Sequence, residues 1–145
     1  MQLALFLHQA GKNMYRKSVE AYVTVERDST VESNDPHAMI SALLNELLKR
    51  MNLFKSNLKG DEATLRKRNE AYARSISILH ALQSSLDFDN GGEIADNLFL
   101  LYEFARLQLL ESFRTGEMDR IEFAISSLQE IANAWDQIDT LELVD

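Results

Sequence analysis

The stretch "SSLDFDNGGEIADNLFLLYEFARLQLLESF", residues 84–113, decides the fold class. The glycine pair Gly91–Gly92 separates two segments whose apolar residues recur at helical spacing. Because glycine adopts positive φ cheaply, we expect one helix to stop at this pair. We expect the next helix to begin at Glu93, whose carboxylate suits the positive end of a helix dipole.

Working outward, Pro36, Gly60 and Gly116 divide the rest of the chain in the same way, giving four helical blocks. Asp35 and Asp61 are suitable N-caps, and Pro36 suits a first helical position. Each block carries one apolar stripe at helical spacing. The stripes are Ile40, Leu44, Leu47, Met51, Phe54, Leu58; Leu65, Tyr72, Ile76, Leu79, Leu82, Leu86; Ile94, Leu98, Leu101, Tyr102, Ala105, Leu109; and Ile121, Ile125, Leu128, Ala132, Trp135, Ile138.

The connections between these blocks are short, so consecutive helices should run antiparallel. The sequence therefore predicts an all-α protein, an up-down-up-down four-helix bundle with an N-terminal arm, in a single domain over 1–145. We assign 1–34 to an N-terminal extension and arm, 35–138 to the bundle, and 139–145 to a frayed acidic tail. The arm alternates apolar residues from Val19 to Val25, and both an extended and a partly helical form are open. Residues 1–13 lie outside every pattern, and Met14 is an alternative start.

The chain is acidic and contains no cysteine. Its 145 residues carry a formal net charge of −8, which disfavours nucleic acid as the main partner because duplex binding depends on cations. The lack of cysteine excludes disulfides and fits the cytosol. No segment approaches the roughly 18 apolar residues of a membrane span, so we expect no membrane insertion. Residues 49–74 are a local basic exception, either a solvated hairpin tip or a docking patch for an acidic partner.

Groups for catalysis or metal binding do not converge in the sequence. There is no Glu-x-x-His pair, and "NGG" at 90–92 lacks the Lys-Ser/Thr of a phosphate loop. His8, His37 and His80 are far apart in the chain. We therefore expect a binding protein that is not an enzyme and has no cofactor and no metal.

The third block carries a second apolar stripe. Leu100, Phe104 and Leu107 recur at i, i+4 and i+7 and project opposite the arc that faces the core. Three explanations are open: cover by the arm or a dimer partner, a groove for a helix of another protein, or ordinary scattered exposure. Ile78 and Phe123 are also expected to project away from the core, and they complete the set of candidate partner contacts.

Three stretches resemble one family. "SLDFDNGGEIADNLFLLYEFA" (85–105) is similar to the signature of flagellin export chaperones, the FliS family, with Leu-Asp, Gly-Gly-Glu-Ile-Ala and Asn-Leu-x-x-Leu-Tyr in order. "AYVTVERDSTVESNDPHAMI" (21–40) resembles the family's Ala-Tyr arm and Ser-Pro-His cap, and "IANAWDQI" (131–138) its closing Ala-Trp-x-Gln-Ile. The chain departs at Asn45 and Glu46, where the family often has Asp-Gly.

The resemblance implies a cytosolic chaperone that binds the disordered C-terminal segment of flagellin and prevents its polymerisation before type III export. Ile78, Leu100, Phe104, Leu107 and Phe123 would then contact flagellin. The arm residues Val19 and Tyr22 would dock at the export gate. A homodimer of the free protein is left open.

Two alternatives accompany this interpretation. "LHALQSS" (79–85) resembles a histidine phosphotransfer site around His80, although Gln83 and Ser84 replace the Lys and Gly of that site. A signalling bundle would follow from it. The departure at Asn45–Glu46 leaves open a paralogous chaperone with a different flagellar client.

Overall fold

Four helices make up the part of the chain that the computed structural model describes, residues 35–142. They are α3 (Pro36–Ser56), α4 (Glu62–Ser84), α5 (Phe88–Thr115) and α6 (Asp119–Glu142). The predictions for the arm, including Val19 and Tyr22, lie outside these residues.

Local side-chain caps fix where the first two helices begin. The Asp35 carboxylate accepts a hydrogen bond from the backbone N–H of His37 at 3.0 Å, with Pro36 at the first helical position. The Asp61 carboxylate accepts from the backbone N–H of Thr64 at 2.9 Å. Both predicted caps are confirmed.

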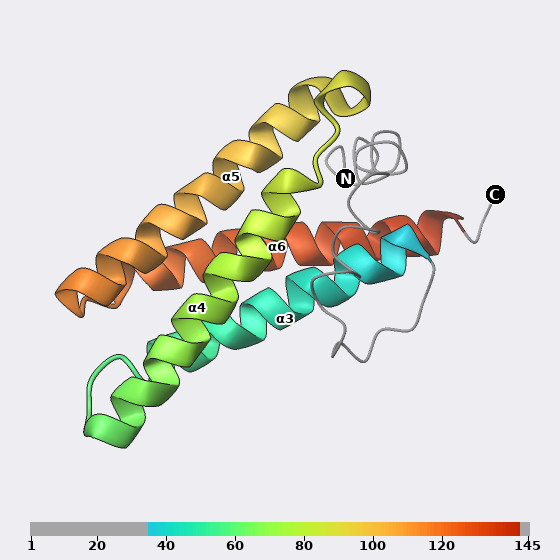
Figure 1. The fold of residues 1–145 in the computed structure, drawn as a ribbon. Coiled ribbons are helices and arrows are strands. Elements are labelled where there is room, and N and C mark those ends of the chain that lie inside the picture. Colours follow the sequence, from blue (N-terminus) through green and yellow to red (C-terminus); the bar gives the residue numbers. More distant parts are fainter. Residues whose placement is uncertain (1–34, 143–145) are drawn as a thin grey trace.

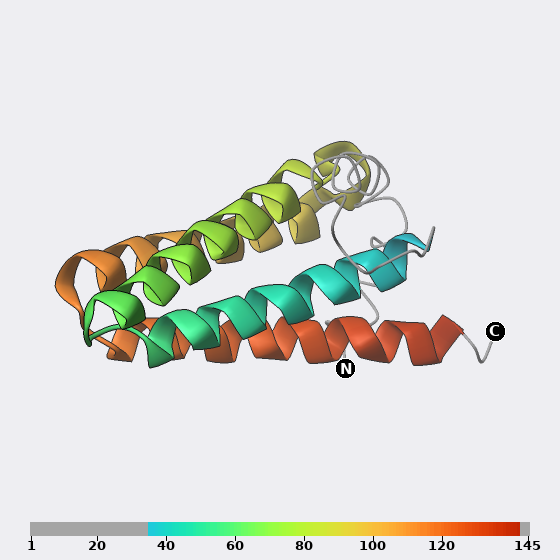
Figure 2. The ribbon, with the colours of Figure 1, turned by 60° about the horizontal axis from the view of Figure 1, so that its bottom comes forward.

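The helices run alternately up and down, and each lies beside two others. α3 packs against α4 and α6, and α5 packs against the same two helices, which closes the four into a ring (Figure 1). Turned by 60°, the view shows α3 and α6 side by side in one layer, with α4 and α5 in the other (Figure 2). The predicted all-α antiparallel four-helix bundle is confirmed.

The core lies between the two layers and is filled mainly by the predicted stripes. Every residue of the first stripe is buried, and so are Leu98, Tyr102, Ala105 and Leu109 of α5. Tyr72 of α4 bridges Phe54 of α3 and Phe113 of α5, with ring centroids 5.9 and 4.5 Å apart. Such aromatic contacts add to the burial that stabilises the bundle.

Residues far apart in the sequence also meet at one end of the bundle. The His37 and Trp135 rings stack, with centroids 4.7 Å apart and planes 9° from parallel. The Trp135 indole N–H donates to the His37 carbonyl at 2.9 Å, and His37 Nε2 lies 2.7 Å from the Trp135 carbonyl. A carbonyl can only accept, so Nε2 carries a proton here. Two of the three stretches that resemble one family, 21–40 and 131–138, are therefore in direct contact.

Three boundaries differ from the prediction. α4 ends at Ser84 rather than at the glycine pair, because the Asp87 side chain accepts from the N–H groups of Asp89 and Asn90 and starts a new helical turn. Gly92 breaks the regular helix with φ 51° and ψ −132°, so the uninterrupted part of α5 does follow it. α6 continues to Glu142, so the first residues of the predicted tail are helical. No glycine or proline intervenes there to stop the helix.

The buried face of α4 is also rotated relative to the predicted stripe. Ile78 is only 1% exposed and lies in the core, so the expectation that it projects outward is wrong. Ala71, Ser75 and Leu82 are buried on the same arc, whereas Tyr72 is only partly buried. Ala71, Ser75, Ile78 and Leu82 recur at spacings of four, three and four residues, so the core-facing stripe of α4 runs through them, beside the predicted one.

Candidate partner-binding surface

The outward face of α5 exposes large apolar side chains. Leu100 is 63% exposed and Leu107 is 46% exposed, one on either side of Phe104 along the helix. Phe104 is partly buried and packs against the edge of the core. The prediction that Leu100 and Leu107 project away from the core is confirmed, and for Phe104 it holds only in part.

A residue of α6 joins this face. Phe123 is 64% exposed, as expected, and its ring meets Phe104 edge to face with centroids 5.7 Å apart and planes at 84°. We refer to Leu100, Phe104, Leu107 and Phe123 together as the outer apolar stripe. The contact between Phe104 and Phe123 makes the stripe continuous across the junction of α5 and α6.

The position of α5 in the ring explains why the outer apolar stripe is left uncovered. The opposite face of the helix, around Tyr102 and Leu109, already fills the space between α4 and α6. A helix in a four-membered ring has two neighbours and no third to cover its outside. Leu100 and Leu107 accordingly keep large exposed fractions.

Two cations near the stripe are paired with carboxylates along α5 itself. Arg106 donates a hydrogen bond to Glu103, which raises the pKa of the guanidinium above its ordinary value, and Arg114 pairs with Glu111 at 2.6 Å. Because both cations bind carboxylates one turn earlier in the same helix, the apolar surface is bordered by ion pairs. Such a border favours an apolar partner over a strongly charged one.

Sequence reasoning missed several exposed apolar residues. Phe88 and Phe99 are exposed, and their rings meet at 5.9 Å beside the α4–α5 connection. Leu110 is exposed one turn beyond Leu107, and its spacing could have placed it with the outer apolar stripe. The Phe88–Phe99 pair depends on the early end of α4, which the sequence pattern did not indicate.

The remaining candidate residues do not contribute to this surface. Ile78 lies in the core, so a partner docking on the outside cannot reach it. His80 is exposed on α4, and its Nε2 lies 3.4 Å from the Ser84 hydroxyl. Between residues 35 and 142 no group of three or more His, Cys, Asp or Glu is placed to hold a metal ion. No helix in that range is both long and apolar enough to cross a membrane.

Known proteins resemble this chain over the whole described range, 35–142, and over part of the segment before it. A family model described as "Flagellar protein FliS" matches residues 18–142. The chain belongs to the FliS family. It is 36% identical over 130 residues to the flagellar secretion chaperone FliS of Salmonella typhimurium, covering 86% of this chain and 93% of the relative. It is 28% identical over 123 residues to the Vibrio cholerae protein of that name, covering 85% and 89%.

A third FliS-family relative, the flagellar secretion chaperone FliSB of Pseudomonas aeruginosa, is 25% identical over 122 residues, covering 84% of this chain and 95% of the relative. The FliS match begins at residue 18, so it leaves out residues 1–13, as the sequence patterns predict. Within it lie all the residues of the outer apolar stripe.

Proposed function

We propose that this protein is a flagellar secretion chaperone that binds the disordered C-terminal segment of flagellin in the cytosol. Its relatives carry that chaperone name, and a flagellin-type client follows from the family. The observation that carries the proposal is the outer apolar stripe, where Leu100 and Phe123 are each more than half exposed.

Such a stripe suits a client whose own apolar face has no partner yet. A filament subunit buries its terminal segment against other subunits, and before export those neighbours must be kept away. An amphipathic helix laid along α5 would cover Leu100 and Leu107 and meet the aromatic pair Phe104–Phe123. The apolar face would then be satisfied by the chaperone and unavailable for polymerisation.

The free energy gained by burying the stripe and the cost of ordering the client segment are of similar size, which is compatible with reversible binding. Ordering a disordered segment on binding costs about 2–5 kcal/mol. Full burial of a Leu or Phe side chain contributes about 1.5–3 kcal/mol. The stripe residues are already partly buried, so they recover only a fraction of this value each. Burial of the stripe can therefore offset the free-energy cost of ordering the client segment. Tight binding would need further contacts, and the exposed Phe88–Phe99 pair is suited to provide them.

Binding, without a catalytic step, is sufficient for this role. In the proposal, Val19 and Tyr22 of the arm dock the complex at the export gate, which leaves the bundle free to hold the client. A homodimer would bury the same outer apolar stripe, so client and second copy would compete for it.

The test compares two double variants by calorimetry with a peptide covering the C-terminal segment of flagellin from the same organism. Leu100→Asp with Leu107→Asp places two charges on the stripe and leaves the partly buried Phe104 intact. Asn45→Asp with Ser77→Asp adds the same charge at exposed positions of α3 and α4. We expect at least tenfold weaker binding for the first variant and less than a twofold change for the second.

Two controls accompany the calorimetry. Circular dichroism should give the same helical content for both variants, because all four positions are exposed. Sedimentation of the free protein reports any dimer that the stripe mediates. If the stripe variant binds the peptide like the unmodified protein, the outer apolar stripe is not the client site. If neither protein binds the peptide, family membership gives the fold but not this client.

A further inference from the structure

The described bundle is electrically polarised along its length. Eight of its eleven Lys and Arg residues fall within 49–74, which spans the α3–α4 turn and the neighbouring parts of both helices. Arg114 and Arg120 flank the α5–α6 turn at the same end, where the acids are Asp61, Glu62, Glu111, Glu117 and Asp119. At the opposite end, residues 84–97 contain Asp87, Asp89, Glu93 and Asp96 and no Lys or Arg. The outer apolar stripe does not account for this separation of charge.

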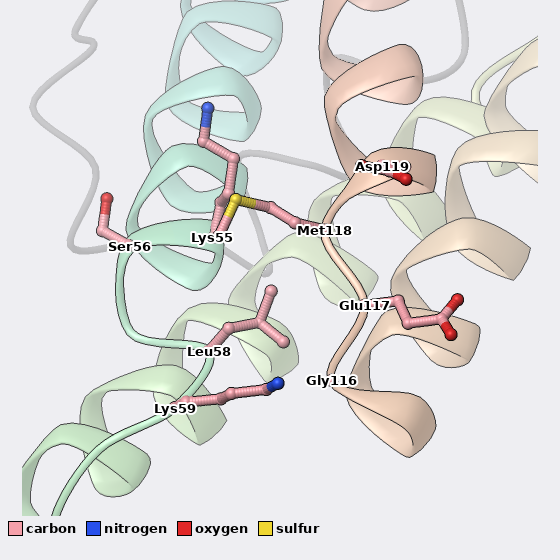
Figure 3. A pocket seen from close by; sticks show the side chains of 8 residues that line it. All are labelled: Lys55, Ser56, Leu58, Lys59, Gly116, Glu117, Met118 and Asp119. Atoms are coloured by element: carbon pink, nitrogen blue, oxygen red, sulfur yellow. The ribbon is translucent and has the colours of Figure 1, made fainter.

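Two adjoining hollows open at the basic end. The wider, of about 560 Å³, lies between the end of α3 and the segment that joins α5 to α6 (Figure 3). The narrower, of about 350 Å³, lies between the α3–α4 turn and the end of α5. Leu58, Lys59 and Gly116 line both. Apolar side chains contribute to each: Met118 in the wider hollow, and Leu65 and Phe113 in the narrower.

Cations line the narrower hollow and are held in place. The Lys59 stem crosses Gly116, where an added Cβ would lie 3.1 Å from Lys59 Cε, and Gly116 has the left-handed φ of 77°. The Arg68 guanidinium lies 4.6 Å from the Phe113 ring centroid and donates to Asn69 Oδ1 at 2.9 Å. Arg114, paired with Glu111, completes the lining.

Helix electrostatics explain only some of these charges. Lys55 and Arg114 lie in the last turns of α3 and α5, where a cation gains about 0.3–1 kcal/mol from the helix dipole. Arg66, Lys67 and Arg68 follow within two turns of the start of α4, where the dipole gives cations no such gain. In the described part of the chain Lys59 makes no ion pair. Arg66 pairs with Glu62 of the same helix at 3.6 Å. Among the cations that line the narrower hollow, Lys59 and Arg68 have neither a favourable helix-dipole position nor an ion pair within the described residues.

We propose that this basic end, centred on Lys59 and Arg68, docks an acidic segment of a partner polypeptide that carries apolar side chains among its acids. Carboxylates would pair with the cations while the apolar side chains contact the partly buried Leu65 and Phe113. Glu117 and Asp119 line the wider hollow, so we expect the carboxylates of the partner at the narrower hollow, which no acidic residue lines. This surface is separate from the outer apolar stripe and does not depend on the proposed client.

The net charge of the whole chain does not oppose this docking. α4 has 23 residues, so at 1.5 Å per residue it separates the two ends by about 35 Å. The Debye length at physiological ionic strength is about 8 Å, so the acidic end is screened from a ligand at the basic end. The charged side chains that line the narrower hollow are all cations, Lys59, Arg68 and Arg114, and these lie nearest to a ligand bound there.

Fluorescence anisotropy at physiological salt tests the proposal with a labelled synthetic peptide of alternating Glu and Leu. The test variant Lys59→Gln with Arg68→Gln removes two cations that line the hollow. The control variant Lys49→Gln with Arg120→Gln removes the same charge at exposed positions outside it. We expect at least tenfold weaker peptide binding for the test variant and less than twofold for the control.

Two further ligands test whether binding requires the carboxylates of the peptide and whether another polyanion can replace it. The peptide with Gln in place of Glu should not bind, and a single-stranded RNA oligomer should bind more weakly than the acidic peptide. Equal losses in the two variants, binding of the Gln peptide, tighter binding of the RNA, or no binding of the acidic peptide would each overturn the proposal. Binding of the flagellin peptide should be unchanged in the test variant, and a matching loss there would show that the two surfaces are one site.

Discussion

The two faces of α5 are made from the same kinds of residue and have opposite surroundings. The inner face presents Leu98, Tyr102 and Leu109, all buried. The outer face presents Leu100, Phe104 and Leu107, and its two leucines are 63% and 46% exposed. Leu107 and Leu109 are two positions apart in one helix. Composition and helix propensity are therefore the same for both, and only the neighbouring helices distinguish them.

The comparison shows how one helix can serve stability and binding at once. Apolar area that faces α4 and α6 contributes to folding, whereas equal area facing outward is available to a partner. An exposed apolar patch on a folded monomer commonly marks an interaction site. The inner and outer faces should accordingly respond to substitution in different assays.

The largest expected effect is on stability, from Leu109→Ala. The inner-face leucine is fully buried, so its loss should lower the free energy of unfolding by about 2–5 kcal/mol through lost burial and the cavity left behind. Leu107→Ala, its matched control on the outer face, should change it by no more than about 0.5 kcal/mol. Urea denaturation followed by circular dichroism measures both. Similar values for the two variants would contradict the division into an inner and an outer face.

A smaller effect is expected where the two faces meet, at the Phe104–Phe123 pair. A double-mutant cycle of Phe104→Leu and Phe123→Leu should give a coupling energy of about 0.5–1.5 kcal/mol, because edge-to-face rings interact beyond their area burial. Denaturation of the two single variants and the double variant supplies the cycle. Additive losses would mean that Phe123 belongs to the surface alone.

The smallest expected effect on stability comes from the Asp61 N-cap of α4, which lies on neither face of α5. The backbone and side chain of Thr64 donate to Asp61 and lower the pKa of that carboxyl below its ordinary value of 3.8. Asp61 therefore contributes stability above the unfolded pKa, and this contribution is lost as the pH falls through the lower folded value.

Asp61→Asn keeps a capping acceptor and removes the titration. The difference in stability between the two proteins should be small near neutral pH and should shrink further in acid. Thermal denaturation over a series of pH values measures it. A difference that grows as the pH falls would reverse the sign of the expected linkage.

The predicted fold depended on features that act over a few residues. The caps at Asp35 and Asp61 and the helix end at Gly116 each join groups within four positions, so the sequence displays them directly. Where two local signals competed, the prediction was wrong. The Asp87 cap starts a new turn before the glycine pair, so α4 ends earlier and Phe88 comes to lie beside Phe99.

The candidate surface was predictable to the extent that one helix determines it. Leu100 and Leu107 follow from the period of α5 and from its need for a single buried arc. The period of α4 also places Ile78, four residues before Leu82, on a buried arc with Ala71 and Ser75. The predicted stripe ran through Tyr72 and Ile76 and so was rotated away from this arc.

The sequence by itself determined the helical class, three of the helix ends and the family, because caps, breakers and motifs are contacts between near neighbours in the chain. Only the tertiary structure decided that Phe104 meets Phe123, that His37 stacks on Trp135, and that Lys59 and Arg68 line one hollow. These contacts join separate segments of the chain. Their formation depends on which helices become neighbours, and no single helix period contains that information.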